Sequence, residues 1–132
     1  IENQIIIVDT DVIINYVKKT ASTILEKYLR LQNQKKVELK VSTITIFEYF
    51  SGVSFSNNME YETAELLFKQ FTIQEVNEKI VKIAARLNNE KRLSSSIGLA
   101  DVLIGSTALF LNAPLLTLNQ HHFKLIPNLI FA

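Results

Sequence analysis

The chain has 132 residues, of which 48% are apolar and 20% are charged, with only three glycines and two prolines. This composition is typical of a compact, helix-rich globular domain and excludes collagen-like, low-complexity and disordered classes. Fourteen Lys and Arg residues against 13 Asp and Glu residues give a formal net charge of +1, so no overall field attracts the chain to nucleic acid or membranes.

The chain contains no cysteine, which excludes disulfides, thiolate metal ligands and cysteine-based catalysis. No apolar run reaches the roughly 18 residues of a membrane span. We therefore expect one domain over residues 1–132, soluble, cytoplasmic and without membrane contact.

The first half of the chain alternates short apolar runs with helical patterns. The expected elements, in order, are a strand at 4–8, helices at 12–17 and 24–29, a strand at 38–41 and, over 42–50, a loop entering a helix. The run at 4–8 is continuous and β-branched, which is typical of a parallel strand covered on both faces. Glu48 is expected in the first turns of the helix that follows the second strand.

The second half continues the alternation. Its expected elements are a helix at 60–71, a strand at 72–76, a helix at 80–87, a loop at 94–98, a helix at 99–111, a strand at 115–118, a loop or short turn at 119–123 and a strand at 129–131. The helix at 99–111 is apolar almost all round and should be central. This order predicts an α/β fold with a mostly parallel sheet and helices on both faces.

Polar residues follow three of the expected strands directly. Asp9 ends the first strand, Ser42 and then Glu48 follow the second, and Asn119 follows the late strand. In parallel α/β sheets, sites form beyond the carboxyl ends of the strands. We expect these residues to lie near one another.

All three aspartates of the chain, Asp9, Asp11 and Asp101, stand against apolar runs. An ionised carboxylate walled in by apolar side chains costs several kcal/mol unless it is paired. If Asp9, Glu48 and Asp101 converge, each pair at about 4 Å repels by roughly 4 kcal/mol. No Lys or Arg lies near them in sequence, whereas Mg²⁺ or Mn²⁺ would offset the charge of an all-oxygen cluster.

Each of these acids also has a purely structural interpretation. Asp9 could cap the following helix. Asp11 and Asp101 each lie in a first helical turn, where the helix dipole favours a negative charge. Glu48 stands three residues after Thr45, which is the spacing of a capping box.

Five segments in order carry a recognisable pattern. They are IIIVDTDVIINYV (5–17), VSTITIFEYFSG (41–52), IAARLNNEKR (83–92), IGLADVLIGSTAL (97–109) and LLTLNQHHFKLIPNL (115–129). Together they resemble the PIN-domain ribonucleases, and within them the VapC-like toxins of toxin–antitoxin pairs.

The resemblance implies a small three-layer α/β/α sandwich that hydrolyses RNA with Mg²⁺ or Mn²⁺. It further implies Asp9, Glu48 and Asp101 as catalytic metal ligands, with Asn119 at a fourth metal-binding position. A homodimer and a cognate antitoxin that inserts a segment near the active site are implied as well.

The sequence departs from the family pattern at two positions. Asp11 stands where Asn is common, and His122 stands where an Asp often precedes the Phe of the late loop. Because Asn119 offers an oxygen without charge, we expect one metal ion to bind tightly. Asp11 is expected to lie next to the metal ligands rather than to contact the ion itself. His121 and His122 are adjacent and are interpreted as surface or partner-contact residues.

Two other functions stay open at this point. Asp9 and Asp11 also fit the DxD motif of a phosphatase, in which the first Asp is phosphorylated and the second is the acid/base. The Lys and paired acids that such an enzyme needs are not evident later in the chain. The uncharged Asn119 keeps open a catalytically weak PIN-like module that acts by binding RNA or protein.

Overall fold

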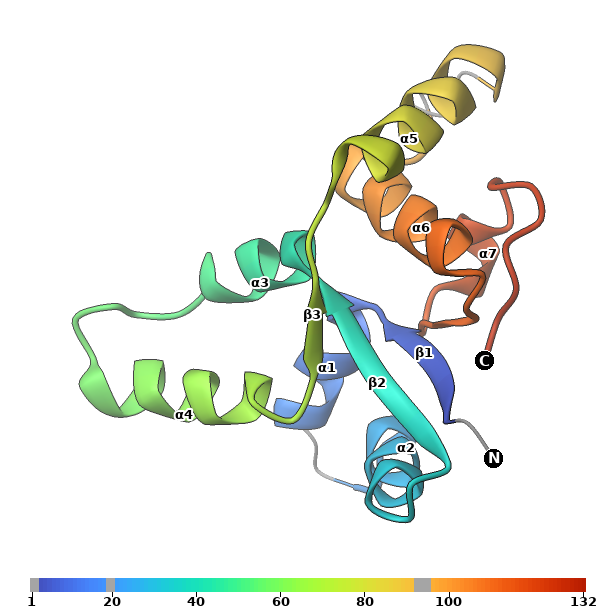
Figure 1. The fold of residues 1–132 in the computed structure, drawn as a ribbon. Helices are drawn as coiled ribbons and strands as arrows, with labels where there is room; N and C mark the ends of the chain where they lie inside the picture. Colours follow the sequence, from blue (N-terminus) through green and yellow to red (C-terminus); the bar gives the residue numbers. More distant parts are fainter. Residues whose placement is uncertain (1–2, 19–20, 92–95) are drawn as a thin grey trace.

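A computed structural model of the chain describes residues 3–18, 21–91 and 96–132, and strands alternate with helices along it (Figure 1). The elements are β1 (Gln4–Val8), α1 (Thr10–Val17), α2 (Ile24–Asn33), β2 (Val37–Ser42), α3 (Thr43–Phe50), α4 (Asn58–Phe68), β3 (Thr72–Gln74), α5 (Glu78–Lys91), α6 (Leu99–Leu111), β4 (Leu115–Leu116) and α7 (Gln120–Phe123). The first two residues of the predicted loop at 94–98 lie outside the described residues.

The four strands form one parallel sheet in the order β3-β2-β1-β4. In its register, Ile6 pairs with Leu39 and Val8 pairs with Leu116. Because all four strands run the same way, their carboxyl ends meet at one edge of the sheet. Asp9, the first of the predicted site residues, lies at this edge. The predicted α/β fold is confirmed.

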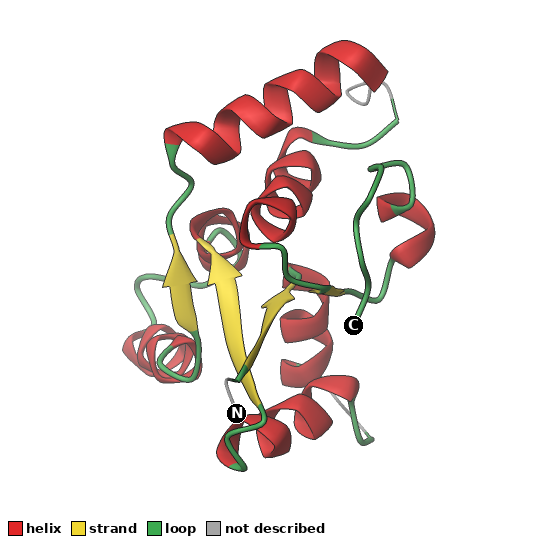
Figure 2. Cartoon of the chain, turned by 45° about the vertical axis from the view of Figure 1, so that its right-hand side comes forward, coloured by secondary structure: helices red, strands yellow, loops and turns green. Residues whose placement is uncertain are grey.

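Helices cover both faces of the sheet, so the chain has the predicted three layers (Figure 2). Side chains alternate along a strand, and β1 shows this clearly. Ile6 and Val8 belong to a core cluster that includes buried residues of α1, α2 and α4. Ile7 belongs to a second cluster with buried residues of α5, α6 and α7.

Several local predictions differ from the structure, beyond shifts of a few residues at the ends of elements such as β3 and α4. The loop expected before α3 is absent, because Ser42 caps this helix directly and its Oγ accepts a hydrogen bond of 3.0 Å from the amide of Ile44. The strand expected at 129–131 is reduced to one parallel bridge between Leu115 and Phe131. β4 is shorter than expected because Thr117 leaves the ladder, and its hydroxyl bonds to Asp9.

The expected loop at 119–123 contains the short helix α7. Its start is fixed by the carbonyl of Asn119, which accepts hydrogen bonds from the amides of His122 (3.2 Å) and Phe123 (3.3 Å). The side chain of Phe123 is buried, with 1% exposed, and draws this turn onto the core. The segment was predicted as a loop or short turn, and the structure shows a single helical turn that the buried Phe123 side chain holds against the core.

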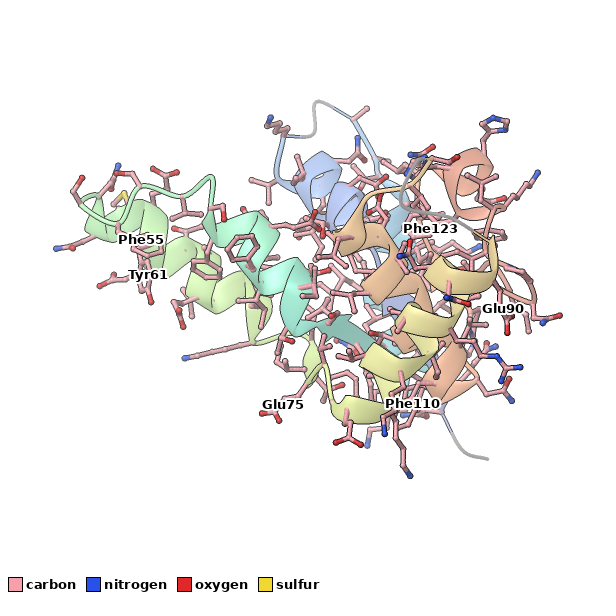
Figure 3. The ribbon with its side chains drawn as sticks, turned by 90° about the horizontal axis from the view of Figure 1, so that it is seen from above. Phe55, Tyr61, Glu75, Glu90, Phe110 and Phe123 are labelled. Carbon is pink, nitrogen blue, oxygen red and sulfur yellow. The ribbon has the colours of Figure 1, made fainter. Side chains whose placement is uncertain are left out.

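α3 and α4 lie side by side and extend away from the sheet (Figure 1). Edge-to-face ring contacts join them, with ring centroids of Phe50 and Tyr61 at 5.6 Å and of Tyr49 and Phe68 at 5.2 Å. Phe55 and Tyr61 pack at the outer end, with centroids 5.3 Å apart (Figure 3). Within the described ranges, no helix has the length and apolar character needed to cross a membrane.

Candidate active site

Asp9 lies where β1 ends and α1 begins, and only 5% of it is exposed. Its Oδ1 accepts a hydrogen bond of 2.8 Å from the amide of Thr10, and its Oδ2 accepts one of 2.8 Å from the Thr117 hydroxyl. Asp9 is therefore the N-cap of α1, as the structural interpretation predicted. Capping accounts for one oxygen, and the other is held by the loop after β4.

The pKa of Asp9 is raised to about 8. Burial is the main cause, because it disfavours the charged form, and the negative charge of Asp11 adds to it. The hydrogen bonds from Thr117 and from the Thr10 amide act in the opposite direction but do not prevail. Among the residues that the structure describes, no positive charge is paired with this buried carboxyl group.

Glu48 is half-buried within α3 and is not part of a capping box, because Ser42 rather than Thr45 is the N-cap of this helix. The hydroxyl of Thr10 donates a hydrogen bond of 2.6 Å to Glu48 Oε1. The hydroxyl oxygens of Thr10 and Thr45 lie 3.0 Å apart. Glu48 is thereby tied to the residue next to Asp9.

Asp101 lies in the first turn of α6, and its side chain is 30% exposed. Its Oδ2 is 3.2 Å from His122 Nε2. Burial raises the pKa of Asp101, the contact with His122 lowers it, and the charge of Asp11 raises it. The negative charge of Asp11 thus raises the pKa of both Asp9 and Asp101.

Asp11 is in the first turn of α1, as predicted, and its Oδ1 accepts a hydrogen bond of 3.3 Å from the amide of Leu118. Asn119 follows and is exposed, and its amide donates a hydrogen bond of 3.0 Å to the Thr117 hydroxyl. The Asn119 side chain makes no capping bond to α7. Its backbone lies at the site, and ligation by its side chain stays a prediction.

Sequence reasoning missed two parts of this site. The hydroxyls of Thr10, Thr45 and Thr117 are buried and connect the acids, and the only sequence signal was their position directly after or near the ends of strands. His122 was interpreted as a surface or partner-contact residue, yet it contacts Asp101. The sequence offered one signal for this role, because His122 stands at a position of the family motif where Asp is common.

The oxygen chemistry of this site suits a hard divalent ion. Among the described residues, no Lys or Arg is paired with Asp9, Glu48 or Asp101. As placed, the described part of the chain brings no three His, Cys, Asp or Glu side chains close enough to share one ion. The donor set fits such an ion in charge and chemistry, and joint binding by three acids would require them to draw closer.

A sequence profile of the PIN domain matches residues 6–128, which is nearly the whole chain. The chain belongs to the PIN domain family. It is 37% identical over 94 residues to Ribonuclease VapC19 of Mycobacterium tuberculosis, covering 70% of this chain and 72% of that protein. The family predicted from the five sequence segments is confirmed.

Solved structures agree with this assignment. One matching structure is VapBC2 from Rickettsia felis, bound to a DNA fragment from the VapBC2 promoter. A chain of this structure matches with a TM-score of 0.84 at 26% identity, over 98% of both chains. VapBC-1 from nontypeable Haemophilus influenzae matches with a TM-score of 0.80 at 27% identity, over 98% of this chain and 97% of that one. In this PIN domain, the acids described above lie at the carboxyl edge of a fold shared with VapBC proteins.

Proposed function

We propose that this PIN domain is a metal-dependent endoribonuclease and the toxin of a toxin–antitoxin pair. The observation that carries the proposal is Asp9, a buried carboxyl group at the sheet edge with a strongly raised pKa and with Asp11 beside it. A divalent cation compensates such a group, and the resemblance to Ribonuclease VapC19 supplies RNA as the substrate class. The family assignment leaves the phosphatase alternative without support.

Asp9, Glu48 and Asp101 would hold Mg²⁺ or Mn²⁺, and Asn119 could add a neutral oxygen. When bound, such an ion lowers the pKa of water and offsets charge on the scissile phosphate. The hydroxyls of the chain do the orienting, because Thr117 fixes one oxygen of Asp9 and Thr10 fixes one oxygen of Glu48. Neither a histidine base nor a covalent intermediate is required.

A groove beside the site supports an antitoxin partner. It is lined by Ile14 and Val17 of α1, Tyr49 of α3 and Ala64 of α4, with Glu48 among the lining residues. Ile14 is 37% exposed and Val17 is 51% exposed, although both are apolar. We propose that the cognate antitoxin inserts a segment here, next to the acids, and that two toxin chains form a homodimer.

Expression of the chain alone in bacteria, followed by sequencing of RNA 5′ ends, tests the proposal. We expect growth arrest and new 5′ ends with the wild-type chain, and neither with Asp9→Ala. Equal toxicity of both proteins without new RNA ends would favour the binding module instead. The positions of the ends also identify the RNA that is cut.

A further inference from the structure

Asp101 is paired with a histidine of α7, the short helix after β4. The distance from His122 Nε2 to Asp101 Oδ2 is 3.2 Å, and the two side chains are 29% and 30% exposed. We propose that His122 is a positioning residue, which holds the Asp101 carboxylate in place to bind the metal ion. This inference rests on the proposed metal-dependent function.

The backbone of His122 is itself firmly placed. Within α7 its amide donates to the carbonyl of Asn119, and its neighbour Phe123 is 1% exposed. Phe123 lies beside α6 (Figure 3), and a few residues later Ile126 is also buried, with 2% exposed. The histidine ring therefore extends from a segment that is anchored in the core on its other side.

Gly105 leaves room on α6 for the side chains of this segment. A Cβ built at Gly105 would overlap the Cδ1 of Ile126 and would lie 3.8 Å from the ring of Phe123. Gly105 is four residues after Asp101, so the two positions share one face of α6. The side chains of Ile126 and Phe123 thus pack on α6 one turn away from the contact between His122 and Asp101.

A hydrogen-bond donor can hold the Asp101 carboxylate in one orientation before the ion binds. The Asp101 side chain is only 30% exposed, and its Oδ2 lies 3.2 Å from His122 Nε2. A ligand held by a hydrogen bond also loses less conformational freedom when the ion binds, which is why partners behind the ligands affect metal affinity by about 10- to 100-fold. The bond needs only an N–H at Nε2, which the neutral ring can supply.

Calorimetric titration of the metal-free chain with Mn²⁺, in the absence of RNA, tests the inference. We expect His122→Ala to weaken Mn²⁺ binding by about 10- to 100-fold. His122→Gln should bind within about 3-fold of wild type, because glutamine also carries an N–H donor at its ε position. His121→Ala is the matched control, since this neighbour is exposed, and its affinity should not change.

Several results would overturn the inference. If His122→Ala binds Mn²⁺ as tightly as wild type or more tightly, or if a folded His122→Gln protein is as weak as His122→Ala, the hydrogen bond does not position the ligand. In an Asp101→Asn background His122→Ala should have no further effect, and a further loss would show that His122 acts elsewhere. Thermal melts establish that each variant is folded. If His122→Ala is not folded, His122→Gln decides, and a folded His122→Gln protein that binds Mn²⁺ more than about 10-fold more weakly than wild type overturns the inference.

The same titration separates this inference from the proposed function. Wild-type protein that does not bind Mn²⁺ contradicts the metal-dependent function itself. Wild-type binding that is indifferent to His122 contradicts only the positioning role.

Discussion

At the scale of single residues, Asp9 carries most of the functional argument. It is 5% exposed and accepts two hydrogen bonds, yet burial, with the charge of Asp11 adding to it, makes its ionisation unfavourable. A protein under selection for stability alone would gain by replacing a buried carboxylate in such surroundings. A cation bound at this position would offset the free-energy cost of burying the Asp9 carboxylate.

Asp9 makes the stability of the metal-free protein depend on pH. Its pKa is about 8 in the folded chain against 3.8 as the ordinary value, so the folded state keeps its proton where the unfolded state has lost it. The favourable contribution is complete below the ordinary value and is lost as pH rises toward the folded value. We expect the free energy of unfolding to fall by a few kcal/mol between about pH 4 and pH 8.

Asp9→Asn removes this titration and should flatten that part of the pH profile in urea unfolding measured in EDTA. At pH 8 the variant should be more stable than the metal-free wild type. A variant that is less stable than wild type at pH 8 would show that capping of α1 outweighs the burial of the charge.

Asp11 supplies charge that Asn119 lacks. We expect Asp11→Asn to weaken Mn²⁺ binding by roughly 3- to 10-fold without abolishing RNA cleavage, because affinity follows the number of charged ligands nearby. Asn119→Asp should tighten binding. Calorimetry measures both, and two tight sites in the unmodified, RNA-free protein would contradict the expectation of one firm site.

At the scale of elements, the starts of α1 and α3 are joined through one hydroxyl. Thr10 Oγ1 donates to Glu48 Oε1 and lies 3.0 Å from the hydroxyl of Thr45, which is fully buried. Since a hydroxyl has one proton, Thr45 must donate to Thr10 when Thr10 donates to Glu48. The two helices thus place Glu48 next to Asp9 through a shared chain of hydrogen bonds.

Thr10→Val should cost about 1 to 2 kcal/mol of unfolding free energy, because it leaves the Thr45 hydroxyl without its partner. It should also weaken Mn²⁺ binding, since Glu48 loses its donor. Thr45→Val is the matched control: it removes the other bond and keeps the Thr10–Glu48 contact. Urea unfolding and calorimetry distinguish the two variants, and equal loss of Mn²⁺ affinity in both would contradict this role of Thr10.

Some elements could be predicted from the sequence and others could not. The helix at Leu99–Leu111 was predicted with its observed bounds, because an apolar segment between Gly98 and Pro114 leaves little choice. α7 and the contact of His122 with Asp101 could not be predicted, because they depend on how the segment after β4 packs against α6. The acids Asp9, Glu48 and Asp101 could be selected by position and family motif, whereas the hydroxyls that orient them depend on the register of neighbouring strands.

At the scale of the whole molecule, two core clusters on opposite faces of the sheet hold its carboxyl edge in place. Asp9 lies at this edge, and the apolar groove between α1, α3 and α4 adjoins it at Glu48. A net charge of +1 gives no overall attraction for RNA, so the site must bind its substrate locally. This arrangement lets a single partner segment in the groove also cover the acids.

The groove gives a prediction about the partner. Val17→Glu should prevent co-purification with the antitoxin, taken as the small protein encoded next to this gene, because it places a charge in an apolar contact. Val81→Glu on α5 is the control, since Val81 is 47% exposed and is not among the groove residues. Both variants should cleave RNA as wild type does, and retained partner binding by Val17→Glu would contradict the groove assignment.

The most direct test of metal-dependent RNA hydrolysis is cleavage of a labelled bacterial RNA by the purified chain, in EDTA and after addition of Mn²⁺ or Mg²⁺. We expect no cleavage in EDTA, cleavage on addition of either ion, and none under any condition with Asp101→Ala, because the ligands act as one unit. Cleavage by the wild-type chain that persists in EDTA, or that survives the loss of Asp101, would contradict the account.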